Sequence, residues 1–166
     1  MGKKDVNFTF ENNRFNYRVG IIVFCEDKVL ITKFDHVDFY NIMGGRVKFG
    51  ESTKDAVKRE LKEELGYDLN VPIELKIISE ELFEWQGKNV QELSFIYKLK
   101  LPKEYYERFS NFAILDSIDE RVNWFTKSEL QKINCIKKFM KQLFDLPQGI
   151  VHAINGKIVS YNNKEE

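Results

Sequence analysis

Three glutamates lie close together on one predicted helix, in the segment "GGRVKFGESTKDAVKRELKEELG" (residues 44–66). Glu60 precedes Glu63 and Glu64 by three and four residues, and side chains at these spacings are neighbours on a helix. Like charges placed in this way destabilise a helix by roughly 0.2–0.5 kcal/mol per pair. Within the group only Glu63 has a basic residue, Arg59, at the matching distance. Either this is a solvated charged surface, or a cation from solution binds there.

The ends of this helix can be predicted from its flanking residues. Ser52 is suited to cap the N-terminus, with Asp55 as its partner at the third helical position. The helix should therefore begin at about Thr53. Gly66 follows the last apolar residue and is suited to the left-handed conformation that commonly ends a helix.

An apolar stripe along the same helix predicts which side is buried. Val57, Leu61 and Leu65 recur at helical spacing. At 100° per residue, the three glutamates occupy an arc roughly 120° from this stripe. Their carboxylates should therefore converge at the edge of the core. Several carboxylates on one rigid face suit a hard divalent cation such as Mg²⁺ or Mn²⁺, which takes oxygen ligands.

The composition places this helix in an ordinary globular chain. The 166 residues are 43% hydrophobic and 31% charged, which predicts one domain over residues 1–166. Basic and acidic residues balance at 26 each, so we expect no sequence-independent nucleic-acid binding. No stretch has the ~20 apolar residues of a membrane span, and the first residues have no signal-peptide core. We therefore expect a cytoplasmic protein without a membrane partner, and homo-oligomerisation stays open.

The two cysteines do not suggest a metal site. Cys25 and Cys135 stand singly inside apolar runs, without the spacing of a ligand cluster. Buried reduced thiols are the better interpretation.

The remaining pattern predicts strands on both sides of the helix. Residues 14–34 should form an antiparallel hairpin, and residues 102–117 a loop with a helical turn. Residues 126–144 have apolar residues at helical spacing behind a Thr126–Glu129 capping box. Asn155–Gly156 predicts a tight hairpin turn in a C-terminal extension, residues 147–166. Further strands are expected over residues 39–45, 70–85, 92–101 and 120–125. The predicted fold class is α/β (α+β), a mixed sheet between helices.

The spacing of the fixed residues resembles the Nudix box, G-x5-E-x7-R-E-U-x-E-E-x-G-U, where U is apolar. The last apolar position holds Tyr67, and Met43 stands where the family usually has proline. The flanking order of strands and helix is also similar to the Nudix arrangement. The resemblance implies a Nudix-type mixed β-sheet sandwiched between α-helices. The fixed positions are filled by Gly45, Glu51, Arg59, Glu60, Leu61, Glu63, Glu64 and Gly66.

The resemblance also implies a reaction. Nudix proteins typically hydrolyse a diphosphate linkage in a nucleoside diphosphate joined to another group, so we expect a small nucleotide-diphosphate substrate. The implied metal ligands for Mg²⁺ (or Mn²⁺) are the three glutamates, with the Gly44 carbonyl as a further oxygen. Arg59 and Glu51 would orient the ligands. Together with Glu63 and Glu92 they form the expected catalytic group. The alternative is a catalytically weak Nudix-fold module that senses a nucleotide.

Other candidate residues have two interpretations each. Glu92 resembles a family glutamate that acts as a further metal ligand or as the base that activates water, and it is equally suited to be an exposed strand residue. Arg18 and Arg46 are candidates for binding a substrate phosphate, or are ordinary surface arginines. His36 and His152 are isolated and are not expected to be catalytic.

Overall fold

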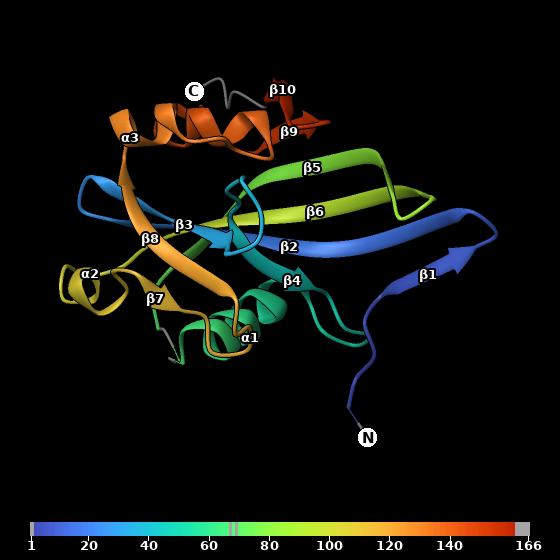
Figure 1. The fold of residues 1–166 in the computed structure, drawn as a ribbon, viewed down its shortest axis with the longest axis horizontal. Coiled ribbons are helices and arrows are strands. Elements are labelled where there is room, and N and C mark those ends of the chain that lie inside the picture. The colour runs from blue at the N-terminus through green and yellow to red at the C-terminus, as the bar shows by residue number, and fades with distance from the viewer. Residues whose placement is uncertain (1, 67, 69, 162–166) are drawn as a thin grey trace.

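The computed structural model describes residues 2–66, 68 and 70–161. Its centre is one mixed sheet with the strand order β10-β9-β5-β6-β2-β3-β8-β7, and β1 and β4 also pair with β2 (Figure 1). The strands are β1 (Asn7–Phe10), β2 (Asn13–Cys25), β3 (Lys28–Phe34), β4 (Met43–Arg46), β5 (Ile73–Trp85), β6 (Lys88–Lys100), β7 (Phe112–Ala113), β8 (Glu120–Thr126), β9 (Val151–Ile154) and β10 (Lys157–Tyr161).

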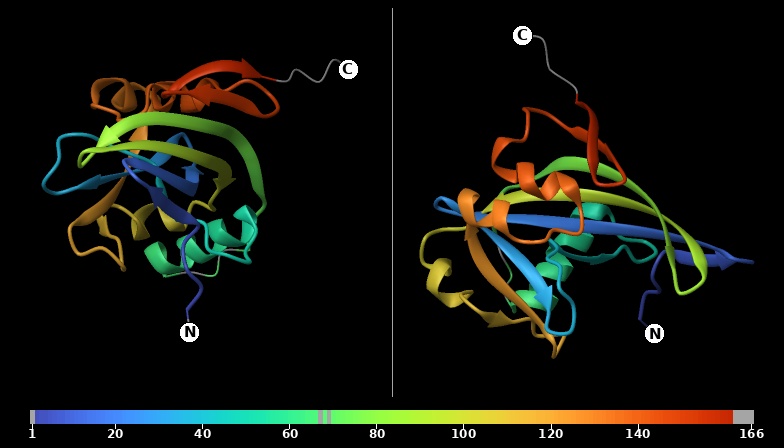
Figure 2. Two further views of the ribbon diagram at one scale, coloured as in Figure 1. Left: turned by 90° about the vertical axis from the view of Figure 1, so that its right-hand side faces the viewer. Right: turned by 45° about the horizontal axis from the view of Figure 1, so that its top comes forward.

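Helices cover the two faces of this sheet (Figures 1 and 2). On one face α1 (Thr53–Leu65) and α2 (Tyr105–Arg108) pack on a core that includes Val19, Ile21 and Leu61. On the other face α3 (Lys127–Lys132) and the 3₁₀ helix η1 (Lys138–Asp145) pack on a second core around Ile22 and Ile96. The predicted mixed sheet between helices is confirmed. No helix among the described residues is both long and apolar enough to span a membrane.

The predicted limits of α1 are confirmed. The Ser52 hydroxyl accepts a hydrogen bond from the Asp55 N–H, and Gly66 ends the helix at φ 77°. The Asp55 carboxylate accepts from the Ser52 hydroxyl, and a backbone hydrogen bond from Ser52 also lowers the pKa of Asp55. The predicted apolar stripe is buried at all three positions. Tyr67, the last position of the motif, lies outside the described residues.

The position of β4 over α1 depends on two glycines. β4 pairs antiparallel with β2, so that Gly44 lies opposite Gly20 and Gly45 opposite Val19. Gly44 has φ 149°, and a Cβ atom there would lie 2.1 Å from the Val19 carbonyl oxygen. Further along, β2 leaves β4 and pairs with β3 instead. The sheet therefore splits beside β4, and α1 packs against β4 and β2 in this region (Figure 1).

Both predicted hairpins are confirmed. β2 and β3 form the first, and β9 and β10 the second, whose turn residues Asn155 and Gly156 have φ of 48° and 73°. Residues 162–166 of the predicted C-terminal extension lie outside the described residues. Residues 102–117 contain the single helical turn α2, as expected.

The single helix predicted over residues 126–144 is wrong. The Thr126–Glu129 capping box is present, but α3 ends at Lys132. The next residues pair with the backbone around Tyr40, which accepts from the Ile136 N–H and donates to the Asn134 carbonyl. The chain then resumes as η1. Pairing with a distant segment therefore replaced the helical hydrogen bonds that the local pattern favoured.

Candidate active site

The Arg59 guanidinium donates hydrogen bonds to three carboxylates. Its Nε and Nη2 donate to the two oxygens of Glu51 at 3.1 and 2.8 Å, which is a bidentate pair. Its Nη1 donates to Glu60 at 2.6 Å and to Glu63 at 2.8 Å, and Nη2 also donates to the Arg46 carbonyl at 2.9 Å. The hydrogen bonds from Arg59 lower the pKa of Glu51. One guanidinium therefore orients two of the three glutamates predicted as ligands.

Gly45 allows Glu60 to lie directly against β4. A Cβ atom at Gly45 would lie 2.1 Å from an oxygen of the Glu60 carboxylate, so no other residue fits here without moving that side chain. Glu60 is buried, and this burial raises its pKa despite the hydrogen bond from Arg59. The first glycine of the motif thus shapes the surface on which the carboxylates gather.

Glu64 is the least compensated of the acidic groups. It is only 5% exposed. Of the interactions that determine its pKa, only the backbone hydrogen bond from Gly44 favours the charged carboxylate. Its Oε2 is buried without a hydrogen-bond partner. Burial, followed by the charges of Glu60, Glu120 and Asp116, raises the pKa of Glu64 to about 9. A buried carboxyl of this kind is costly unless a cation or proton joins it.

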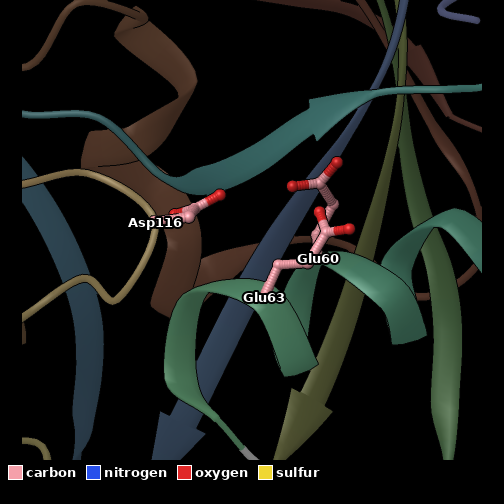
Figure 3. Close-up of side chains that lie close together, drawn as sticks. All are labelled: Glu60, Glu63 and Asp116. Carbon is pink, nitrogen blue, oxygen red and sulfur yellow. The ribbon is translucent and has the colours of Figure 1, made fainter. Parts of the chain in front are cut away.

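Asp116 belongs to the same acidic group, although sequence reasoning missed it. Carboxylate oxygens of Glu60, Glu63 and Asp116 lie within 4.8 Å of one another. Asp116 comes from the loop before β8 and points toward the two glutamates of α1 (Figure 3). Burial, with the neighbouring Asp116 charge, raises the pKa of Glu120 in the same region. Only the acidic run around residue 116 could have signalled this loop, because no motif links it to α1.

The donor set fits a hard divalent cation. All side chains in the group offer carboxylate oxygens, the ligands that Mg²⁺ and Mn²⁺ prefer. The Glu64 oxygen without a hydrogen-bond partner lies beside this group. A buried carboxylate is stabilised by a neighbouring positive charge, and a bound cation would supply one. Glu60 and Glu63, two of the three glutamates predicted as ligands, thus lie together with Asp116. Glu64 lies near Glu60 and Asp116 and accepts a backbone hydrogen bond from Gly44.

A pocket of 390 Å³ opens on the other side of β4, lined by Gly20, Met43, Phe83 and Glu92 among others. Glu92 is not a member of the acidic group around Asp116. Its carboxylate lies 3.8 Å from Arg18 Nε and 3.6 Å from Lys137 Nζ. In the described sheet β6 begins at Lys88, so Glu92 is an interior strand residue rather than the first. Lys137, which the sequence did not single out, joins the pocket from the break before η1.

The other candidate side chains lie apart from the acidic group. Arg46 Nη1 is 3.4 Å from Asp5, and its carbonyl is held by Arg59. His36 pairs with Asp119 and His152 with Glu80. Both cysteines are free thiols.

We predict that Glu92→Gln acts mainly on substrate binding. The Glu92 carboxylate holds the Arg18 and Lys137 side chains in position. Without it these two cations lose their fixed geometry, so the KM should rise by about 10-fold while the metal requirement stays normal. Steady-state kinetics over a range of Mg²⁺ concentration and pH checks this, with exposed Glu84→Gln as the control. A fall in kcat of about 100-fold or more that lessens at high pH would instead identify a base. A raised metal requirement would identify a ligand.

Comparison with known proteins agrees with this geometry. The NUDIX domain family model matches residues 14–146. A protein of Nostoc sp. described as an uncharacterized Nudix hydrolase is 30% identical over 102 residues, which are 57% of this chain and 56% of that protein. The aligned part therefore spans just over half the length of this relative.

Solved structures share the fold at low identity. The MutT protein from Bacillus halodurans matches with a TM-score of 0.61 and 20% identity over 91% of this chain and 99% of its own. The NUDIX domain of Shewanella oneidensis NrtR, solved with ADP ribose, matches with a TM-score of 0.56 and 16% identity over 76% of this chain and 80% of its own. With the family model covering most of the chain, and the motif folded into one acidic site, the chain belongs to the Nudix hydrolase family.

Proposed function

We propose that this chain is a metal-dependent pyrophosphohydrolase that cleaves the diphosphate linkage of a nucleoside diphosphate joined to another group. The observation that carries the proposal is the buried Glu64 oxygen without a partner, next to Glu60 and Asp116. A fold alone needs no such uncompensated acidic group, because buried carboxylates are costly. A site that binds Mg²⁺ or Mn²⁺ does need one.

In this proposal the residues of the site have two roles, metal binding and orientation of the ligands. Glu60, Glu63, Glu64 and Asp116 would hold the metal, with the Gly44 carbonyl as a further oxygen. When bound, the metal would neutralise phosphoryl oxygens and lower the pKa of the attacking water. Arg59, fixed by Glu51, would keep the ligands in one geometry.

The pocket beside β4 is suited to the substrate. Most of its lining is apolar, and its polar part includes Glu92, with Arg18 and Lys137 on either side. The two cations would bind a phosphate or another anionic group of the substrate. That the related domain from Shewanella was solved with ADP ribose supports a nucleoside diphosphate derivative as the ligand class.

The proposal predicts hydrolysis that depends on a divalent metal. The protein is incubated with a panel of nucleoside triphosphates, nucleotide sugars, ADP ribose, dinucleoside polyphosphates and capped RNA, with Mg²⁺ or Mn²⁺, and the products are identified by mass. At least one compound should be cleaved at its diphosphate linkage. Excess chelator should abolish this activity, because the acidic group would then lack its cation.

Two results would contradict the proposal. Undiminished hydrolysis in excess chelator would exclude the metal site. Tight binding of a panel compound in calorimetry, without product in the presence of either metal, would favour the sensing module. The acidic group would then have to serve binding alone.

A further inference from the structure

The C-terminal hairpin of β9 and β10 extends the sheet beyond β5 (Figure 1). The family model ends at residue 146, so both strands lie outside the matched region. β9 pairs in parallel with β5 over Ile77 to Glu80, and its residues Val151 and Ala153 are fully buried. The hairpin is therefore packed into the fold, and its turn lies next to Glu81 of β5.

The turn of this hairpin fixes the Glu81 carboxylate. Its Oε1 accepts hydrogen bonds from the Gly156 N–H at 3.2 Å and from the Ser79 hydroxyl at 2.7 Å. The preceding residue of β5 is tied to the same turn, because the Glu80 carbonyl accepts the Asn155 N–H at 2.8 Å. The hairpin therefore determines where this carboxylate lies.

Glu81 and Glu92 hold Lys137 between them at the substrate pocket. Lys137 Nζ lies 3.9 Å from Glu81 Oε1 and 3.6 Å from Glu92 Oε1. The three side chains line the pocket and are only 14%, 12% and 11% exposed. The fold gains little from largely buried charges, because apolar residues of similar volume are often equally or more stabilising. A lysine in this position therefore indicates a role toward the ligand of the pocket.

Gly156 also determines where the backbone of Lys137 lies. A Cβ atom at Gly156 would lie 2.8 Å from the Lys138 nitrogen and 3.3 Å from the Lys137 Cα. In addition, the Gly156 carbonyl accepts a hydrogen bond from the Phe139 N–H at 2.6 Å. The hairpin thus contacts the segment between α3 and η1 directly, and it fixes Lys137 both at the backbone and, through Glu81, at the ammonium group.

We propose that the β9–β10 hairpin is part of the substrate site, with Glu81 and Gly156 as positioning residues for Lys137. Lys137 presents its ammonium group to an anionic group of the substrate, and Glu81 restricts the lysine to one geometry. This inference rests on the proposed function, because it concerns the same substrate. It adds that residues outside the family match determine how tightly this chain binds that group. The acidic group lies on the other side of β4, so the metal requirement should not depend on the hairpin.

Glu81→Gln tests the contact with the ammonium group. With a panel compound that the protein cleaves, KM should rise by about 10-fold, while kcat and the metal requirement change by less than about 2-fold. Lys137→Met should have the same effect, and Lys137→Arg should recover part of the affinity. Because Glu81 acts through Lys137, the double variant should be no worse than Lys137→Met alone. The control is Glu84→Gln, an exposed residue of the same strand.

Gly156→Ala tests the contact with the backbone. The added methyl group meets the Lys138 nitrogen, so the turn must move, and KM should rise by about 3–10-fold. Gly87→Ala in the β5–β6 turn is the matched control. Gly87 has φ 72°, against 73° for Gly156, but a Cβ atom there meets nothing within 4 Å. Both variants carry the same backbone strain, and only Gly156→Ala adds the contact. Circular dichroism confirms that each variant is folded.

Calorimetry with the panel compounds in excess chelator separates this inference from the proposed hydrolysis. The dissociation constant should rise in Glu81→Gln and Gly156→Ala by about the same factor as KM. Cleavage with an unchanged KM in Glu81→Gln and Lys137→Met would overturn the inference alone, as would a Gly156→Ala variant that behaves like Gly87→Ala. Binding that the variants weaken, without cleavage by the wild type, would overturn the hydrolysis alone. A wild type that neither binds nor cleaves any compound would overturn both.

Discussion

Replacing Glu64 by glutamine is expected to lower turnover by about 100-fold or more, because the proposed metal ligand would lose its charge while its volume is kept. Glu63→Gln should have a similar effect on turnover. The glutamine side chain can still accept the hydrogen bond from Gly44, so the helix and β4 should keep their positions. Metal titration should show that the half-maximal rate needs a higher Mg²⁺ concentration than in the wild type.

The same substitution should stabilise the metal-free protein. The pKa of Glu64 is raised from 4.5 to about 9 in the folded chain. The folded state therefore holds a proton that the unfolded state releases, and stability falls as pH rises from 4.5 toward 9. At pH 7 this difference costs about 3 kcal/mol, which glutamine does not incur. In chelator, Glu64→Gln should melt at a higher temperature than the wild type, and the gap should widen with pH.

Calorimetry in chelator and in Mg²⁺ checks both parts. Mg²⁺ should stabilise the wild type more than the variant, because the cation compensates the charge that the variant lacks. Exposed Glu107→Gln on α2 serves as the control and should change neither turnover nor melting. Normal turnover in both ligand variants would mean that the glutamates form only a charged helix surface.

The helix that carries the site was predictable from the sequence because its signals are local. Ser52 and Gly66 define its ends, and the apolar stripe defines its buried side. That Glu60 and Glu63 lie together on one side of this helix follows from helical geometry alone. The two hairpins with short turns were predictable for the same reason.

The rest of the site depends on contacts between distant segments. Asp116 reaches the glutamates because β8 pairs with β3, which local spacing does not encode. Glu92 faces Arg18 and Lys137 because β6 pairs in parallel with β2, and that register fixes the face on which each residue lies. The break at Lys132 has a similar origin, since Tyr40 supplies backbone partners from another part of the chain.

Replacing Arg59 is expected to have the second large effect, on both stability and turnover. Arg59→Met removes every hydrogen bond that the guanidinium donates to Glu51, Glu60 and Glu63. Glu51 and Glu60 are buried, with side chains 9% and 8% exposed, so their charges would be left unpaired. Breaking such a pair costs about 3–5 kcal/mol. Turnover should fall by about 10–100-fold, because the ligands lose the group that orients them.

A double substitution tests whether Arg59→Met destabilises the protein by leaving a buried charge unpaired or by damaging the fold in general. Removing the orphaned charge in Arg59→Met/Glu51→Gln should recover part of the lost stability, whereas two independent defects would add. Urea denaturation of both single variants and the double variant measures this coupling. Arg121→Lys is the control, because its ion pair with Asp35 is exposed and contributes little. Additive losses, or an Arg59→Met protein with normal stability and turnover, would show that Arg59 is a surface ion pair rather than the residue that holds the site together.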